Sequence, residues 1–331
     1  GDVYKRQAGN KRLQCLADGA PLGLRRIGLQ PASIEGSAIQ HQQAFTATRS
    51  VPVPIPVVYH PLYSAPLPST HRFPMAKFRM LHDLLLAQGV ISHSQLHRPV
   101  SVARRDLERV HSRSYHEAFS GDRLTRPEQR RIGLPPTRPL VQRTWLAVGG
   151  TLLCARLALR HGLACHLAGG THHAHPDFGS GFCIFNDCAV TARVLLERNE
   201  LQSVLVLDLD VHQGDGTAAC FADDPRVVTV SVHAASNFPL RKVASDHDLP
   251  LADATGDQEY LAVIGDRLPG LLDEIRPQLV LYNAGVDAHR DDRLGRLDLS
   301  DEGLMQRDRL VLDACLRRRL PVATVIGGGY D

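Results

Sequence analysis

Short apolar segments alternate with longer amphipathic ones along the chain from about residue 53. Apolar runs of strand length lie at Val53–His60, Gly162–Leu167, 204–209, Val227–Val232, Gln278–Ala284 and Val322–Ile326. Apolar residues recur at helical spacing in Phe78–Leu86, Pro139–Leu159, Asp187–Leu196, Asp257–Ile275 and Asp301–Arg318. This alternation predicts an α/β fold in a single domain, with a mainly parallel central sheet and helices on both faces.

The chain before the first predicted helix differs from the rest. The strand at Val53–His60 contains prolines, which cannot donate hydrogen bonds within a sheet, and this favours an edge strand or a loop entry. Residues 1–52 show no sustained periodicity, are rich in Gln, Arg, Ser and Gly, and begin with Gly rather than Met. We therefore expect residues 1–52 to lie outside the fold, as a tail, a translated upstream segment or an expression scar. Residues 53–331 are expected to form the domain.

Four predicted strands end in unusual residues. Ligands of α/β proteins bind outside the carboxyl ends of the strands, so these ends are expected to open on one rim of the sheet. In VLVLDLDVHQGDG, from Val204, a buried run leads into ionisable groups that need a cation or a fixed network of pairs to compensate them. The four segments are Gly169–His175 (GGTHHAH), Asp208–Asp215, Asp287 after YNAG, and Gly327–Tyr330 (GGGY).

Asp210 and His212 are the first candidates for metal ligands. They are two residues apart, so both side chains point to the same side of an extended segment. Asp287 could supply a third ligand. Two carboxylates and one imidazole, with an open position for water, are typical of a catalytic rather than a structural metal site.

The remaining polar residues of these strand ends suggest acid-base chemistry. His172 and His173 follow a glycine turn, and one or both could act as a general base. A base needs a partner that fixes its tautomer, and Asp208 and Asp215 are left unused by the metal. Tyr330, behind three glycines, could donate its hydroxyl to a developing oxyanion. Together these parts predict metal-assisted hydrolysis of an amide or ester.

The composition argues against several other classes of protein. The net charge is only +3 and no run of Lys and Arg exceeds three residues, so no nucleic-acid partner is expected. No window of about 18 consecutive apolar residues and no basic-then-apolar leader is present, so we expect neither a membrane span nor a secretory signal. The seven cysteines include no CxxC and mostly lie in apolar segments, which indicates reduced thiols in a cytoplasmic protein.

At these residues the chain resembles the histone deacetylase family, part of the arginase and deacetylase superfamily, over Val53–Asp331. The matching motifs are HRFPMAKFRMLHDLLL from His71, GGTHHAH followed by GFCIFND, DLDVHQGDG, VSVH from Val230, AGVD and GGGY. Gln213 in HQGDG, RRIGLPPT from Arg130 and DRLGRL from Asp292 look most like the class IV deacetylases and their bacterial relatives. The resemblance implies an arginase/deacetylase-like fold and a deacetylase catalytic domain at residues 53–331.

The resemblance also implies a role for each site residue. The Zn²⁺ ligands would be Asp210, His212 and Asp287, although such a site also accommodates Fe²⁺. His173 would be the general base, buttressed by Asp215, and His172 its electrostatic partner, buttressed by Asp208. Tyr330 would hydrogen-bond the substrate carbonyl and its tetrahedral intermediate.

Two further groups of residues follow from the same resemblance. A structural K⁺ or Na⁺ would use Asp208, Asp210, His212, Ser231 and Val232. The channel for the acyl-lysine side chain would be lined by Gly181, Phe182, Phe238 and Leu294. From the sequence alone, Phe182 and Phe238 could equally be aromatic side chains of the core.

The chain departs from the family pattern at two points. Lys77 stands where better-known members have an arginine at the inner channel, a change that keeps the charge but loses the planar fork. The chain ends one residue after Tyr330, where the family continues, so we expect a C-terminally truncated domain.

The main functional hypothesis is a zinc-dependent deacylase that removes acetyl or longer acyl groups from lysine side chains. A hydrolase of acetylpolyamines or other small amides is one rival. An arginase-like two-metal enzyme is another, but the carboxylates that a second ion would need are better assigned to the histidines. An inactive scaffold or binding protein with this fold is the alternative of a different class. The acyl-chain length, the native substrate and the oligomeric state stay open.

Overall fold

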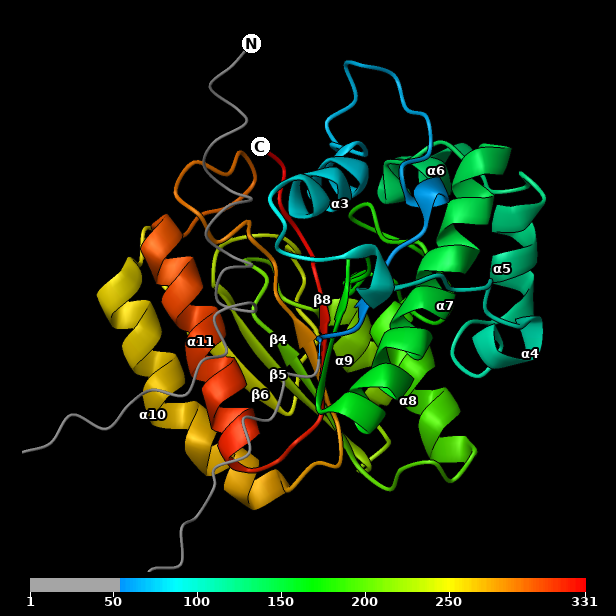
Figure 1. Ribbon diagram of the computed structural model, residues 1–331. Helices are drawn as coiled ribbons and strands as arrows, with labels where there is room; N and C mark the ends of the chain where they lie inside the picture. Colours follow the sequence, from blue (N-terminus) through cyan, green and yellow to red (C-terminus); the bar gives the residue numbers. More distant parts are fainter. Residues whose placement is uncertain (1–53) are drawn as a thin grey trace, which may run out of the picture.

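The computed structural model describes residues 54–331, which form one eight-stranded sheet between two layers of helices (Figure 1). The prediction for residues 1–52 lies outside the described residues. The sheet order is β2-β1-β3-β8-β7-β4-β5-β6, and every pairing among these strands is parallel. The strands are β1 (Val57–Val58), β2 (Leu96–His97), β3 (Leu163–His166), β4 (Val204–Asp208), β5 (Val227–Ala234), β6 (His247–Leu251), β7 (Val280–Asn283) and β8 (Val322–Val325).

The two faces of the sheet carry separate apolar cores. In β4, Val204 and Val206 join the cluster that contains residues of α7 and α8, whereas Leu205 and Leu207 join the cluster of α10 and α11. The two helix pairs lie on opposite sides of the strands in Figure 1. Because both faces are covered, the central strands are continuous apolar runs, which is why the sequence pattern revealed them. The predicted α/β fold with helices on both faces is confirmed.

The predicted helices are present with small changes at their ends. Asn186 caps α8, since its side chain accepts a hydrogen bond from the Ala189 amide at 2.9 Å. The α-helices are α3 (Lys77–Ala87), α4 (Arg104–Leu107), α5 (Arg113–Ser120), α6 (Arg126–Ile132), α7 (Arg138–His161), α8 (Asp187–Glu197), α9 (Asp215–Phe221), α10 (Asp257–Ile275) and α11 (Asp301–Arg317). The described residues also form two 3-10 helices, η2 (Pro61–Tyr63) and η3 (His93–Gln95).

The prediction of an edge strand near residue 53 was wrong. The observed β1 is short and lies between β2 and β3, because the unpredicted β2 pairs with its outer side. The short helices α4, α5 and α6, together with α9 and β6, were also not predicted. Ile132, for example, is the one buried residue of the arginine-rich α6, so this helix has almost no apolar periodicity to detect.

The four strands with unusual ends are neighbours in the sheet, in the order β3, β8, β7, β4. All four are parallel, so the segments that follow them leave the same edge. This arrangement gathers residues that are more than 150 positions apart in the sequence, such as His172 and Tyr330. The fold thus positions the candidate site.

The expectations about membrane spans and cysteines can be compared with the described residues alone. Among residues 54–331, no helix is long and apolar enough to cross a membrane. Six of the seven cysteines fall in the described part of the chain, and all six are buried.

Candidate active site

A glycine turn after β3 brings His172 and His173 to the rim of the sheet. Gly169 and Gly170 have φ values of +83° and +81°, which side chains rarely adopt. A Cβ on Gly170 would lie 2.5 Å from both the Asn283 Oδ1 atom and the Gly327 Cα atom. Glycine is therefore required where the end of β3 meets the ends of β7 and β8.

Each of the two histidines is paired with a carboxylate. The Nδ1 atom of His172 lies 2.7 Å from Asp208 Oδ2, and the Nδ1 atom of His173 lies 2.6 Å from Asp215 Oδ1. Both imidazoles are buried, and their ring centroids are 4.0 Å apart. Because an ionised carboxylate can only accept, each Nδ1 carries a proton. The pairing that the family resemblance implied is thus present in the structure.

The two imidazoles differ in charge. Burial favours neutral His172, but the Asp208 and Asp210 carboxylates outweigh it and raise its pKa to about 9. For His173, burial dominates and the neighbouring His172 charge adds to it, so the pKa falls to about 3. His173 therefore stays neutral with a free lone pair on Nε2, while His172 is cationic.

Asp210, His212 and Asp287 form a buried cluster that could hold a metal ion, with one ligand atom from each within 4.8 Å of the others. The His212 Nδ1 atom lies 3.0 Å from Asp210 Oδ1 and 3.1 Å from Asp287 Oδ2. Burial, followed by the Asp210 charge, raises the pKa of Asp287 to about 7. Two carboxylates forced together in the interior attract a cation, and this donor set fits a divalent transition metal.

Glycine backbone lies directly against this cluster. The Gly328 amide donates to Asp210 Oδ2 at 2.7 Å, and a Cβ on Gly328 would collide with the Asp287 carboxylate. A Cβ on Gly285 would lie 2.6 Å from Asp210 Oδ2. The ends of β7 and β8 can approach the carboxylates this closely only because they lack side chains.

A fully buried arginine on α11 lies behind the metal-ligand segments. The Arg307 Nη1 atom donates to the Leu209 carbonyl at 3.1 Å and to the Gly285 carbonyl at 2.6 Å. Its Nε atom donates to Asp308 Oδ1 at 3.0 Å. One guanidinium thus joins the backbone before Asp210 to the backbone before Asp287.

Tyr330 lies over the cluster, in a segment held from two sides. Its ring centroid is 6.2 Å from that of His212, and its amide donates to Asp292 Oδ2 at 2.7 Å. The Lys77 Nζ atom donates to the carbonyls of Gly327 and Gly329, each at 3.1 Å. Burial, with the charges of Asp210 and Asp287, raises the pKa of Tyr330 well above its usual value. The phenol therefore stays protonated and can donate a hydrogen bond.

Three of the four predicted channel residues lie beside Tyr330 or His173. The Phe182 ring lies 5.9 Å from that of Tyr330, and the Phe238 ring lies 4.7 Å from that of His173. A Cβ on Gly181 would be 2.7 Å from His173 Cδ2. The Leu294 carbonyl accepts a hydrogen bond from Asn237, the neighbour of Phe238, at 2.9 Å. Phe182 and Phe238 are partly exposed, so neither is a fully buried core side chain.

The residues expected at a monovalent cation lie close together. Asp208 and Ser231 are direct partners in the register of β4 and β5. The Ser231 hydroxyl lies 3.0 Å from His233 Nδ1, and Val232 is buried. The contribution of Asp210 and His212 to such a site stays a prediction.

Sequence reasoning missed two polar residues of the site. Asn283 donates to Asp208 Oδ1 at 2.8 Å, and its place as the polar last residue of an apolar strand was a usable signal. His175 lies 2.9 Å from Asp215 Oδ2 through its Nε2 atom. The available signal was a third histidine in the same short segment, HHAH.

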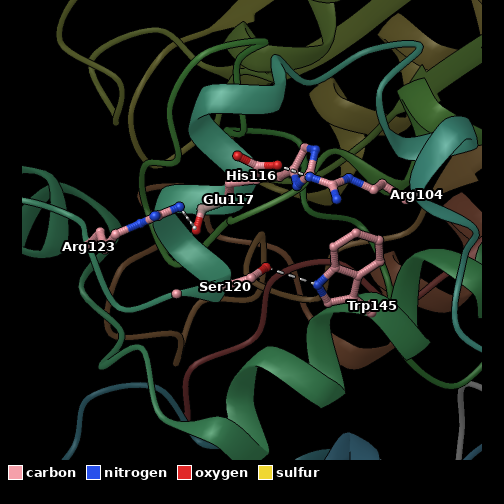
Figure 2. A pocket seen from close by; sticks show the side chains of 7 residues that line it. Arg104, His116, Glu117, Ser120, Arg123 and Trp145 are labelled. Carbon is pink, nitrogen blue, oxygen red and sulfur yellow. Dashed lines mark hydrogen bonds and ion pairs between the residues drawn. The ribbon is translucent and has the colours of Figure 1, made fainter.

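A separate surface pocket of about 320 Å³ lies where α4, α5 and α7 meet (Figure 2). It contains none of the predicted site residues. Trp145 forms one wall and donates to the Ser120 hydroxyl at 3.3 Å. Arg104 is paired with Glu108 and Glu117, so its charge is already neutralised.

The chain was compared with known protein families. A family model described as "Histone deacetylase domain" matches residues 71–331, which include the residues of the site. An uncharacterized protein of Picosynechococcus sp. is 54% identical over 275 residues, covering 83% of this chain and 92% of that protein. Histone deacetylase 2 of Arabidopsis thaliana is 30% identical over 272 residues, covering 78% and 70% respectively. The acetoin utilization protein AcuC of Staphylococcus aureus is 30% identical over 258 residues, covering 71% and 66%.

Solved structures have the same fold. An HDAC homolog from Aquifex aeolicus superimposes with a TM-score of 0.73 at 21% identity, covering 84% of this chain and 80% of that one. An HDAC homolog complexed with SAHA gives a TM-score of 0.71 at 22% identity, with the same coverage. The family model covers more than half of the chain, and the matched residues include all four strand ends of the site. The chain therefore belongs to the histone deacetylase family.

Proposed function

We propose that this chain is a zinc-dependent deacylase that hydrolyses acyl groups from lysine side chains, most like the class IV enzymes and their bacterial relatives. The observation that carries the proposal is the meeting, on four adjacent strand ends, of one metal-ligand cluster, two His–Asp pairs and one tyrosine. The burial of the six described cysteines is in keeping with a reducing compartment such as the cytoplasm.

Asp210, His212 and Asp287 would hold the ion. When bound there, Zn²⁺ would supply Lewis-acid polarisation of the acyl carbonyl and lower the pKa of water. Fe²⁺ suits the same three donors. A second, separate cation, K⁺ or Na⁺, is proposed near Asp208 and Ser231.

His173 would move the proton. Its Nδ1–H donates to Asp215, so the lone pair of Nε2 is free to take a proton from the attacking water. The oxygen then bonds to the acyl carbon, the C–N bond breaks, and the same proton passes to the departing amine. His172, held cationic by Asp208, would stabilise the negative charge that develops nearby.

Tyr330 and the aromatic walls would position the substrate. The protonated phenol can donate to the carbonyl oxygen as that atom gains negative charge. The Phe182 ring lies beside Tyr330 and the Phe238 ring lies beside His173, so these rings would contact the aliphatic part of an acylated lysine.

Two substitutions test the assignment. We expect His173→Gln to lower kcat for an acetyl-lysine peptide by about 1,000-fold, since it removes the base. Tyr330→Phe should cost about 100-fold through loss of one hydrogen-bond donor to the oxyanion. His161→Gln, on the exposed end of α7, is the matched control and should leave kcat unchanged. Unaltered turnover in both site variants would refute the proposal.

The choice of substrates separates this proposal from its alternatives. Peptides with acetyl and longer acyl groups, and acetylated polyamines, should be compared by kcat/KM, with a chelator as the control. A higher kcat/KM for an acetylated polyamine than for any peptide would indicate a small amine as the substrate in place of a lysine side chain. No turnover of any amide would favour a scaffold protein. Two bound metal ions per chain, instead of one, would favour the arginase type.

A further inference from the structure

The third histidine of the GGTHHAH segment, His175, shares a carboxylate with His173. The Oδ1 atom of Asp215 accepts a hydrogen bond from His173 Nδ1 at 2.6 Å. Its Oδ2 atom accepts one from His175 Nε2 at 2.9 Å. Each oxygen of the carboxylate therefore has its own imidazole. Burial alone would raise the pKa of Asp215, but these two hydrogen bonds hold it well below its usual value.

The imidazole of His175 is fixed independently of Asp215. Its ring stacks on that of Phe178, with centroids 4.3 Å apart and an interplanar angle of 15°. Phe178 also contacts Arg131, whose guanidinium lies 4.6 Å from the ring centroid. The His175 amide donates to the Phe178 carbonyl at 2.9 Å. Ring and backbone of His175 are thus both held by the loop that contains Phe178.

A buried histidine, His111, holds the backbone of the partly buried His175. The amide of Asn186 donates to Nε2 of His111 at 2.8 Å, so that nitrogen has no proton. The proton of His111 is therefore on Nδ1, which donates to the His175 carbonyl at 3.0 Å. Because Asn186 caps α8, the position of His175 is tied to the start of that helix.

We propose that His175 is a positioning residue for the general base, holding Asp215 so that Oδ1 faces His173. The inference rests on the proposed function of His173. A carboxylate that lacks a donor on one oxygen can turn about its Cβ–Cγ bond or bind water, and the hydrogen bond to His173 would lose its direction. His175 contacts neither the metal-ligand cluster nor the channel aromatics in any hydrogen bond or ring contact described for it. Its loss should therefore act on proton transfer and leave substrate binding intact.

Two variants of His175 separate the hydrogen bond from the stacking contact. His175→Phe keeps an aromatic ring on Phe178 but removes the donor, and we expect kcat to fall about tenfold with KM within about twofold of the parent. His175→Gln can still present an amide donor to Asp215, so it should recover most of this loss. Equal losses in the two variants, or none in His175→Phe, would overturn the proposal.

A double-variant cycle tests whether the effect passes through His173. In the His173→Gln background the base is already absent, so adding His175→Phe should lower kcat no further. A further tenfold loss would mean that His175 acts in another way, and would overturn the proposal. The unfolding midpoint of each variant and His161→Gln serve as controls for a general structural effect.

A spectroscopic readout makes the test independent of turnover. The short hydrogen bond between His173 and Asp215 should give a downfield proton resonance, identified by its absence in His173→Gln. We expect His175→Phe to shift or broaden this resonance and His175→Gln to preserve it. An unshifted resonance in His175→Phe would overturn the positioning role. Failure of the parent to hydrolyse any acyl amide would instead overturn the proposed function.

Discussion

At the scale of single residues, the site depends on side chains whose protonation is set by their surroundings. His172 and His173 are neighbours in sequence, yet their pKa values are moved in opposite directions, to about 9 and about 3. Burial lowers the pKa of both, but the two carboxylates that face His172 outweigh it there, whereas at His173 burial dominates and the positive charge of His172 adds to it. Equivalent imidazoles thereby acquire different roles, one cationic and one neutral.

The lowered pKa of the buried His111 should make the stability of the protein depend on pH. Burial lowers the pKa of His111 to about 4. Hydrogen bonds with the backbone at His175 and Pro176 and the nearby Asp177 act in the opposite direction, and His116 lowers the pKa slightly further. The unfolded chain, with a pKa near 6.5, binds this proton first as pH falls. The free energy of unfolding should therefore decrease by up to about 1.4 kcal/mol per pH unit between these two values.

Urea unfolding of the parent and of His111→Gln at several pH values measures this contribution. Other buried histidines, such as His166 and His233, also have lowered pKa values, but they titrate in both proteins. The difference between the two slopes thus isolates His111. Parallel pH profiles for the two proteins would contradict the prediction.

At the scale of secondary-structure elements, the glycine turns at the strand ends allow the close contacts of the site. We expect Gly170→Ala to lower the free energy of unfolding by roughly 1–3 kcal/mol, because it places a Cβ at positive φ against β7 and β8. Gly265→Ala is the control. It lies on an exposed part of α10 with open space around it, and should stabilise the protein by about 0.5–1 kcal/mol. Chemical denaturation measures the free energy of unfolding of both variants. A change in the same direction in both would be inconsistent with this account.

The elements that the sequence revealed are those with a strong apolar pattern. The buried central strands and the long helices α7, α10 and α11 bury an apolar face that is visible in the sequence. By contrast, β6 (HDLPL) is half exposed and includes a proline, and it is a strand because β5 pairs with it. Such elements depend on tertiary contacts, which a local pattern does not contain.

The same distinction holds for the site. Asp210, His212 and Asp287 could be found because each follows an apolar strand, and the parallel sheet brings such ends together. The bond from His111 to the His175 carbonyl joins residues 64 positions apart and starts from outside any predicted element. No spacing rule connects the two, so only the folded structure reveals the contact.

At the scale of the whole molecule, metal binding and folding should be coupled. A ligand that binds only the folded chain stabilises it by about 2.7 kcal/mol when its free concentration is about 100 times Kd. We therefore expect added Zn²⁺ to raise the unfolding midpoint of metal-free protein, and a chelator to reverse the change. Asp287→Asn should lose most of this response, because it removes one of three ligands.

The exposed Asp266→Asn on α10 is the matched control and should respond to Zn²⁺ as the parent does. Differential scanning calorimetry at fixed free Zn²⁺ measures all three proteins. An equal shift in Asp287→Asn and the parent would show that the ion binds elsewhere.

The buried pair of Arg307 and Asp308 has a consequence for how relatives of this chain can diverge. Removing one partner of a buried ion pair strands the other charge at a cost of about 3–5 kcal/mol. Replacing both with apolar residues would in addition leave the Leu209 and Gly285 carbonyls without the donor that Arg307 supplies. Across related sequences, these two positions should therefore be retained together, as a charged pair.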